Sequence, residues 1–559
     1  MSEFTVHMPY PGADQARAFK PGAVAHQAAD LSDRALSTWL PPAGSADADL
    51  LPELGVLTPR GRDLERNNPM VAGVVQTYAD GIVGPRGLRF SSKPDYLRLG
   101  KDREWAADLA RLIEALWREA TESTDIDASR TQHMAGLTDN ALRGVLVSGG
   151  ALALPRWDAA GRRGSRFKTY FQLVEIDRLS NPQEAPDSDR LRGGIEFDRE
   201  GAPVAYYIRK AHPGDAHLAG QSLWPFARRQ RTTPGGAMLG TANRILAYEW
   251  ERIPARTPWG RPRVLHLFRK TRPGQSRGKT FMTPIMKKLK MLDHYQQTEL
   301  RAAIVNALIA AFIRTPLPEE AVNEMFGGAA NAADMGVAEF MNALVAQRQA
   351  GQPALQGGAI FHLLPGESLE SFNPNRPGGT YGPFVDKLLS EVAVGFNLAP
   401  SIFLKDFRQN NYSSARADAL ESWRFFRGYT QFLASYWTGA MLRLFMEEWV
   451  NDGLLPIDPE DYYKFPAAYC RGRWDGPPRG NIDPVKEATA DKIKLENGST
   501  TLEDVCAKNG DDWEEVQDQQ ARERARAQKL GIPQPPPTQV SVVVGTGDEP
   551  VPKKEDKDE

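Results

Sequence analysis

Apolar and polar residues follow one another along this chain in two rhythms, one typical of helices and one typical of strands. In the segment 102–121 the apolar residues recur at helical spacing, so that one stripe faces a core. Between residues 167 and 209, short β-branched and aromatic runs alternate with Gly, Pro, Asn and Asp, which is typical of an antiparallel sheet. The first half of the chain is therefore predicted to be α+β. The helical stripe consists of Trp105, Leu109, Leu112, Ile113, Leu116 and Trp117.

Two predicted helices flank a small mixed segment in the second half of the chain. The first helix has Thr283 as its N-cap and Pro284 at its first position, and it extends to about Ile313. The second helix covers about residues 383–398. We interpret the segment between them, 317–377, as a compact unit that these helices carry away from the main body.

The two ends of the chain differ in composition from its middle. Residues 1–50 are rich in Ala, Pro and Asp, so they bury too little apolar surface to fold alone and are predicted to form a flexible arm. A very long helix is predicted over 415–451 and a polar helical segment over 482–530. The last segment, 531–559, is rich in proline and charge and is predicted to be disordered.

The composition is that of an ordinary folded protein. The chain has 559 residues, of which 41% are hydrophobic and 25% are charged, and this allows a sizeable core spread over several domains. Its 69 Lys and Arg against 71 Asp and Glu give a net charge of −2, which argues against a strongly basic protein that coats nucleic acid. With Cys470 and Cys506 as the two cysteines, we expect no disulfide framework. We also expect no membrane contact, because no apolar run is long enough to form a spanning helix.

One loop carries two near-matches to catalytic motifs. Gly278, Lys279 and Thr280 follow a predicted strand and precede a helix, as in a phosphate-binding loop, but three residues separate them from Gly274 where such a loop needs four. Gly274, Ser276 and Gly278 also match a nucleophile elbow, yet Ser276 lies well past the end of the strand. We interpret the loop as a solvent-exposed turn and expect no enzyme activity. The alternative is a hydrolase that uses this loop.

Metal and cofactor sites have little support in the sequence. The eight histidines show none of the spacings that place two imidazoles on one helix face, and no pair of carboxylates stands out. We therefore expect no metal, no cofactor and no catalytic residue.

Two groups of polar residues are candidate contacts for phosphates. The first lies between two predicted helices and offers donors suited to a phosphate backbone rather than to bases, although an ordinary helix connection explains it equally well. Its members are Lys405, Arg408, Gln409, Asn410, Asn411 and Tyr412. The second is a basic cluster at the start of the helix after Pro284, for which a solvated helix face is the alternative. Its members are Lys287, Lys288 and Lys290.

The order of several segments along the chain is more specific than any single motif. Over about residues 31–530, the chain resembles the portal proteins of tailed bacteriophages of the lambda type. The segments that carry the resemblance are 60–69, 81–84, 274–278, 290–293, 412–423, 482–488 and 501–512.

The resemblance implies a ring-shaped DNA conduit at one capsid vertex. Such a protein serves in genome packaging with the terminase motor, in head-tail joining and in DNA ejection. The implied partners are other copies of the chain in a dodecamer, double-stranded DNA, the large terminase subunit, the major capsid and scaffold proteins, and head-completion or adaptor proteins. The implied location is the portal vertex of the virion, after assembly in the host cytoplasm. A cytoplasmic scaffold unrelated to viruses remains an alternative.

The resemblance also implies a mostly helical α+β fold with wing, stem, clip and crown regions. The loop with Lys405 and Arg408 would then be a tunnel loop that faces DNA. The expected regions are a flexible arm at 1–50, the wing at 51–281, a first stem helix at 282–316, the clip at 317–377, a second stem helix at 378–399, the tunnel loop at 400–413, a long helix and wing return at 414–481, the crown at 482–530 and a disordered tail at 531–559.

Overall fold

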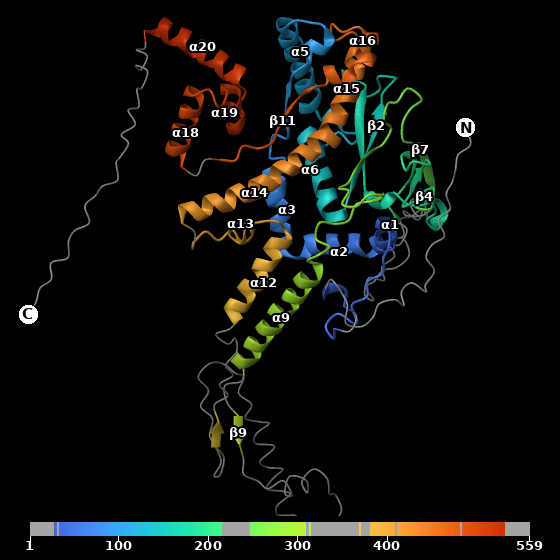
Figure 1. Ribbon diagram of the computed structural model, residues 1–559, viewed down its shortest axis with the longest axis vertical. Helices are drawn as coiled ribbons and strands as arrows, with labels where there is room; N and C mark the ends of the chain where they lie inside the picture. The colour runs from blue at the N-terminus through green and yellow to red at the C-terminus, as the bar shows by residue number, and fades with distance from the viewer. Residues whose placement is uncertain are drawn as a thin grey trace, which may run out of the picture. The chain divides into compact units, whose positions relative to one another are not determined.

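The computed structural model describes residues 27–30, 33–214, 246–308, 312–314, 368–370, 381–408, 411–480 and 483–531. The chain forms two compact units, which are described separately. The first unit comprises Met1–Gln76, Glu119–Gln409 and Leu444–Glu448, and the second comprises Thr77–Arg118, Asn410–Arg443 and Trp449–Glu559. Helices predominate and the strand pairs are antiparallel, which confirms the predicted α+β, mostly helical class (Figure 1). No helix in the described part of the chain is long and apolar enough to cross a membrane.

The first unit contains two antiparallel sheets where the sequence predicted one sheet region. The chain leaves β3 through a 3₁₀ turn at Ile176–Arg178, and this turn redirects it into the second sheet. The faces of both sheets contribute to one apolar cluster, in which Leu152 and Ile208 are almost completely buried. The first sheet has the order β3-β2-β8, with β2 at Ala151–Trp157, β3 at Thr169–Val174 and β8 at Leu265–Leu267. The second has the order β4-β5-β6-β7, with β4 at Leu191–Arg192, β5 at Ile195–Phe197, β6 at Pro203–Arg209 and β7 at Trp250–Pro254.

Two of the helices before these sheets, α1 and α3, begin where a polar side chain caps them. Ser45 caps α1 by accepting a hydrogen bond from the backbone N–H of Ala48, at 3.1 Å. Asn68 caps α3 in the same way through the N–H groups of Met70 and Val71. The bounds are Ala46–Leu50 for α1, Leu54–Asn67 for α2, Pro69–Ile82 for α3 and Met134–Arg143 for α6.

Two packed helices leave the body of the first unit. They are α9, Met286–Leu308, and α12, Tyr381–Gly395, which lie beside each other (Figure 1). A β-carbon added at Gly395 would lie 2.2 Å from a methyl carbon of Ile285, so the absence of a side chain there permits the close contact. Farther along, the rings of Tyr295 and Tyr381 stack with their centroids 5.8 Å apart.

At the far end of this helix pair, the predicted length of the first helix is wrong. The helix predicted to reach Ile313 is not continuous, because Phe312–Arg314 forms strand β9, which pairs antiparallel with β10 at Ser368–Glu370. The near end also differs: α9 begins at Met286, and the hydroxyl of Thr283 bonds to the carbonyl oxygen of Thr280 instead of capping the helix. Residues 315–367, which include most of the predicted compact unit, lie outside the described residues.

The second unit has an aromatic core beneath a pair of strands. Strand β1 at Arg89–Ser92 pairs with β11 at Gly472–Asp475. The ring of Phe90 lies 4.6 Å from that of Trp474, which in turn lies 5.6 Å from that of Trp117. Trp117 belongs to α5, Arg103–Glu122, the amphipathic helix that the sequence predicted. One member of its predicted stripe is misplaced, because Leu112 is 45% exposed.

The long helix predicted over 415–451 is present and begins slightly earlier. It consists of α14 at Tyr412–Leu433, a π-helical turn at Ala434–Thr438, and α15 at Gly439–Asn451. Two short helices follow it, α16 at Pro459–Lys464 and α17 at Pro466–Tyr469.

Within the first unit, the segment Leu444–Glu448 of α15 packs against β3. The ring of Phe445 lies 5.9 Å from that of Phe171. The buried carboxylate of Glu448 accepts hydrogen bonds from the backbone N–H groups of Lys168 and Thr169, at 2.6 and 2.9 Å. This carboxylate therefore satisfies two donors at the beginning of the strand.

The predicted helical segment over 482–530 consists of three helices. They are α18 at Pro484–Glu496, α19 at Leu502–Asn509 and α20 at Trp513–Leu530. Each has a polar N-cap, provided by Asp483, Thr501 and Asp512 respectively. Among residues 483–531, Cys506 is the buried residue, so these helices carry little apolar core of their own.

The loop between β8 and α9 corrects the expectation of a solvent-exposed turn. Gln275, Ser276, Arg277 and Thr280 are all buried. The guanidinium of Arg277 donates hydrogen bonds to the carbonyl oxygens of Ile176, Leu179 and Gly193, at 3.1, 2.8 and 2.7 Å. Burial lowers the pKa of Arg277 to about 10, which leaves the side chain charged at neutral pH. The polar residues of this loop thus hold a buried corner together.

Two glycines determine how closely this corner packs. A β-carbon added at Gly278 would lie 1.8 Å from the carbonyl oxygen of Gly149, and one added at Gly149 would lie 2.7 Å from the carbonyl oxygen of Gly278. Gly149 also has a φ of 88°, a conformation that other residues rarely adopt. Both positions therefore require glycine.

We predict that Arg277→Met destabilises the first unit by about 3–5 kcal/mol, because it removes the donor of three hydrogen bonds to backbone carbonyl oxygens in this corner. The measurement is the midpoint of the first urea unfolding transition, followed by tryptophan fluorescence. The control is Arg272→Met in the same loop, where the side chain is exposed and pairs with Asp49 at 2.6 Å. That change is expected to cost less than about 1 kcal/mol. Equal losses for the two variants would contradict the structural role of Arg277.

Candidate functional site

The loop that resembles catalytic motifs has no geometry for catalysis. The hydroxyl of Ser276 is buried and has no hydrogen-bond partner among the described residues, and its backbone N–H donates to Asp47 at 2.8 Å. Gly149 fills the space over Gly278 that a phosphate would need. Lys279 is exposed. The residues that match the motifs therefore form a packed corner. A separate question is metal binding: the described residues include no group of His, Cys, Asp and Glu that could hold a metal ion.

The first part of the candidate tunnel loop places a carboxylate beside its arginine. Lys405 follows the short helix α13, Pro400–Leu404, and has a left-handed conformation with a φ of 54°. The guanidinium of Arg408 forms a two-pronged ion pair with Asp406, at 2.9 and 2.7 Å. This pair lowers the pKa of Asp406 to about 2. Sequence reasoning missed Asp406, although its spacing of two residues from Arg408 was a usable signal.

The second part of the candidate loop begins the next helix. The side-chain oxygen of Asn411 accepts a hydrogen bond from the backbone N–H of Ser414 at 2.8 Å and so caps α14. Gln409 and Asn410 lie outside the described residues, as does the side chain of Tyr412. Asn411 therefore has a local structural role, whatever else it contacts.

The candidate basic cluster on α9 is partly neutralised. Lys288 pairs with Glu391 of α12, and this contact lowers the pKa of Glu391. Lys290 lies 3.8 Å from Asp293, one turn further along α9. Lys287 is exposed and has no carboxylate partner in the described part of the chain. The cluster thus presents one unpaired cation rather than three.

The second unit contains a concentration of ion pairs that the sequence did not indicate. Acidic side chains of α19, α20 and the turn between them face basic side chains of β1, α5, β11 and the residue after β1. Because these helices bury few apolar side chains, the ion pairs are the main described contact that holds them, and such exposed contacts weaken with salt. The pairs are Arg89 with Asp512, Lys93 with Glu503, Arg111 with Glu514, Arg118 with Glu515, and Arg473 with Asp504.

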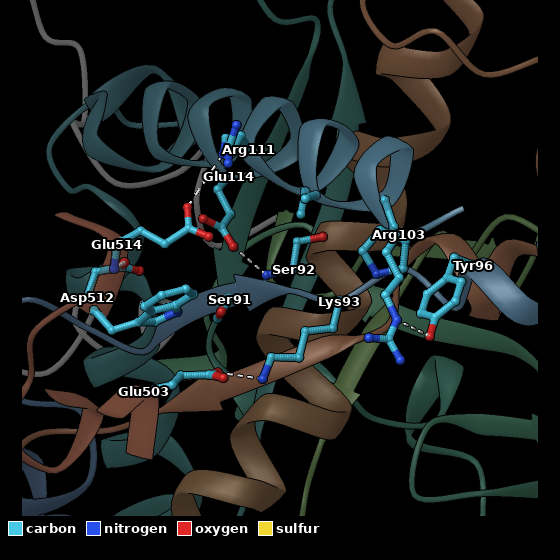
Figure 2. Close-up of a pocket in the computed structure, with 15 residues that line it drawn as sticks. Ser91, Ser92, Lys93, Tyr96, Arg103, Arg111, Glu114, Glu503, Asp512 and Glu514 are labelled. Carbon is cyan, nitrogen blue, oxygen red and sulfur yellow. Dashed lines mark hydrogen bonds and ion pairs between the residues drawn. The ribbon is translucent and has the colours of Figure 1, made fainter. Parts of the chain in front are cut away.

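A cavity of about 270 Å³ lies among these ion pairs, lined by residues of β1, α5 and the start of α20. Figure 2 shows the carboxylate of Glu114 in it, on the same side as Asp512 and Glu514. Glu114 accepts a hydrogen bond from the backbone N–H of Ser92 at 2.6 Å. Burial raises the pKa of Glu114 to about 7, and the negative charges of Asp512 and Glu514 add to the rise. About four hundred residues separate Glu114 from the latter two, so only the fold brings them together.

Comparison with known proteins identifies the family. The family model described as phage portal protein, lambda family, matches residues 32–429. The portal protein of Escherichia phage N15 is 31% identical over 507 residues, which cover 89% of this chain and 89% of the relative. Portal protein B of Escherichia phage lambda is 31% identical over 512 residues, again covering 89% of each chain.

Some solved structures of gene transfer agent particles are more distantly similar. A chain from the neck of a native gene transfer agent particle gives a TM-score of 0.38 at 13% identity, covering 73% of this chain and 93% of that one. A chain from the neck of the empty particle gives a TM-score of 0.39 at 12% identity, covering 82% and 94%.

The family match extends over more than half of the chain, and two curated relatives at 31% identity align with almost all of it. This chain therefore belongs to the lambda family of phage portal proteins and is a portal protein of the virion.

Proposed function

We propose that this portal protein assembles with other copies of itself into a closed ring, a dodecamer, at one capsid vertex. Double-stranded DNA passes through the ring during packaging and again during ejection. The structural observation that carries the proposal is the pair α9 and α12, whose exposed side chains include five large apolar ones among the polar and charged residues. Val394 is 72% exposed, Leu300 63%, Met291 62%, Phe384 51% and Ile304 51%.

These exposed apolar side chains are candidates for burial between subunits. Contiguous exposed apolar residues mark surfaces that become buried in an assembly. A closed ring uses two different surfaces of each subunit, one for each neighbour, and a two-helix projection has two such sides. We therefore assign the exposed apolar residues of α9 and α12 to contacts between neighbouring subunits.

The regions of a portal protein are assigned on this basis. The helices α9 and α12 form the stem, and the segment 317–377 between them forms the clip. The sheets and α14–α15 belong to the wing, the segment 400–413 forms the tunnel loop, and α18–α20 form the crown. The residues 1–50 and 531–559 are the terminal arm and tail.

The electrostatics of the tunnel loop suit a duplex that must slide. A wall of unpaired cations would bind phosphates strongly and hold the DNA in place. In this loop, Asp406 offsets the charge of Arg408, which leaves Lys405 as the cation without a carboxylate partner among the described loop residues. The proposed ring is a conduit without catalytic activity of its own, and the burial of Ser276 in a structural corner supports this. ATP hydrolysis belongs to the large terminase subunit. The capsid, scaffold and adaptor proteins are the other partners.

We predict that reversing the charge of the tunnel loop impairs packaging. Lys405→Glu combined with Arg408→Glu places three acidic residues per subunit beside the duplex, and this repulsion is expected to lower the yield of DNA-filled particles by about tenfold or more. The measurement is nuclease-protected DNA in a packaging assay, with particles lacking this chain as the baseline.

The matched control combines Lys101→Glu with Lys464→Glu, two exposed side chains assigned to the wing. This control changes the net charge equally and is expected to package normally. If both double variants package as well as the unsubstituted chain, the assignment of the tunnel loop is wrong. If particles that lack this chain package DNA at the full level, the proposed function itself is wrong.

We also predict a pH-dependent stability of the crown contact through Glu114. Its pKa is about 7 in the folded chain and 4.5 when the side chain is fully solvated. Between these two pH values, Glu114 is ionised in the unfolded chain while it is still largely protonated in the folded chain. The free energy of unfolding therefore falls as pH rises through this range, and above pH about 7 the loss of stability no longer changes. Glu114→Gln keeps an oxygen that accepts from Ser92 and removes the charge.

At pH about 8 this variant is expected to be more stable than the unsubstituted chain by about 1–2 kcal/mol, and the gap closes near pH 4.5. Thermal unfolding across this pH range measures the effect. Glu104→Gln, at an exposed position on the same helix, is the control and is expected to show no such gap. A gap of the same size at both ends of the range would contradict this role of Glu114.

A further inference from the structure

The helix α20 has its charges separated along its length. The residues from 511 to 518, which cap and begin the helix, are strongly acidic. The residues from 521 to 530 carry four basic side chains and one acidic one, a net charge of +3. The basic side chains are Arg522, Arg524, Arg526 and Lys529, and we call them the basic half of α20.

The two halves differ in what they contact. The acidic half is occupied within the second unit, because Asp512, Glu514 and Glu515 pair with arginines of β1 and α5. The basic half is exposed, and none of its four cations has a carboxylate partner among the described residues. Arg522 donates to the backbone oxygen of Asp518 at 3.4 Å, which leaves its charge uncompensated. The acidic half of the helix is therefore held by ion pairs, and the basic half continues from it as an exposed cationic surface.

Helix stability alone does not explain these cations. The dipole of a helix favours positive charge within its last turn, and of the four cations only Lys529 lies there. The three arginines lie earlier in the helix. Two of them, Arg522 and Arg526, are four residues apart and so share a face with Lys529. The arginines are therefore available for a role other than stabilising the helix.

We propose that the basic half of α20 binds the phosphate backbone of double-stranded DNA, at a site separate from the tunnel loop. This inference rests on the proposed function, which brings DNA to this protein. Guanidinium groups match phosphate oxygens in geometry, and contacts of this kind need no base recognition.

The surface around these arginines fits DNA better than it fits another protein. Protein interfaces contain an apolar or aromatic centre, but the exposed large apolar side chain in this part of the helix is Leu530 alone, at 59% exposure. The other residues between the cations of 521–530 are three alanines, Glu523 and Gln528. Phosphate binding requires only accessible cations. The partner is accordingly a polyanionic backbone rather than an apolar groove.

The test measures the affinity of the full-length protein for a fluorescent duplex of about 30 base pairs, at about 50 and 200 mM salt. The variant combines Arg522→Gln, Arg524→Gln and Arg526→Gln. We expect its affinity at the lower salt concentration to fall by about tenfold or more. The slope of log affinity against log salt is expected to decrease by about one for each phosphate that the variant no longer binds.

The matched control combines Lys486→Gln, Lys492→Gln and Lys494→Gln in α18. It removes the same charge from the same group of helices, but at side chains that already pair with Asp483, Glu496 and Asp491. Its affinity is expected to stay within about twofold of the unsubstituted chain. Circular dichroism of both variants verifies that the helices are retained.

Equal reductions for the two triple variants would overturn the proposal, since net charge rather than the site would then control binding. Unchanged DNA affinity in the arginine variant would also overturn the proposal. If that variant binds DNA normally but fails to enter particles, the basic half of α20 binds a protein partner instead. Ring formation, scored by electron microscopy of the same samples, reports separately on the proposed function. A chain that forms no ring contradicts the proposed function, whereas the comparison of the two variants still decides the DNA site.

Discussion

The guanidinium of Arg277 is the contact on which this corner of the first unit depends, because it ties its own loop to two turns that lie 84 to 101 residues earlier in the chain. It donates to the 3₁₀ turn after β3, to Leu179 and to the turn before β5, and its own loop leads directly into α9. The close approach of Gly149 and Gly278 holds the same loop from the other side. A helix that starts from such a corner has a fixed origin. The proposed stem therefore begins at a closely packed corner of the first unit.

Both groups of candidate phosphate contacts contain cations that are paired with carboxylates. Asp406 neutralises Arg408 in the proposed tunnel loop, and Glu391 neutralises Lys288 on the proposed stem. These pairs are consistent with the net charge of −2. A conduit for a moving duplex needs a surface that attracts the DNA phosphates only weakly at any one point. The arginines of α20 also have no carboxylate partner among the described residues, and the DNA contact proposed for them is separate from the proposed tunnel loop.

Much of the fold could be predicted from the sequence, and the errors have identifiable physical causes. Amphipathic spacing located α5 and the long helix through α14 and α15, because both have one apolar face over many turns. The loop around Arg277 was predicted to be exposed because its residues are polar, yet polar side chains also occur inside a protein where they satisfy backbone groups. The extension of the first stem helix to Ile313 was wrong because apolar residues at short range fit a strand as well as a helix. The candidate site was less predictable: the ion pair of Asp406 is local, whereas the position of Glu114 depends on contacts across most of the chain, for which a single sequence contains no signal.

Closure of this chain into a ring around a channel is the property from which the proposed packaging and ejection roles follow. Single-particle electron microscopy of the purified protein observes it without an intermediate assay. We predict top views with closed rotational symmetry and an open centre wide enough for duplex DNA, with α9 and α12 at the contacts between subunits. Particles that remain monomers or dimers under all conditions, including in the presence of scaffold protein, would show that the chain does not form such a ring.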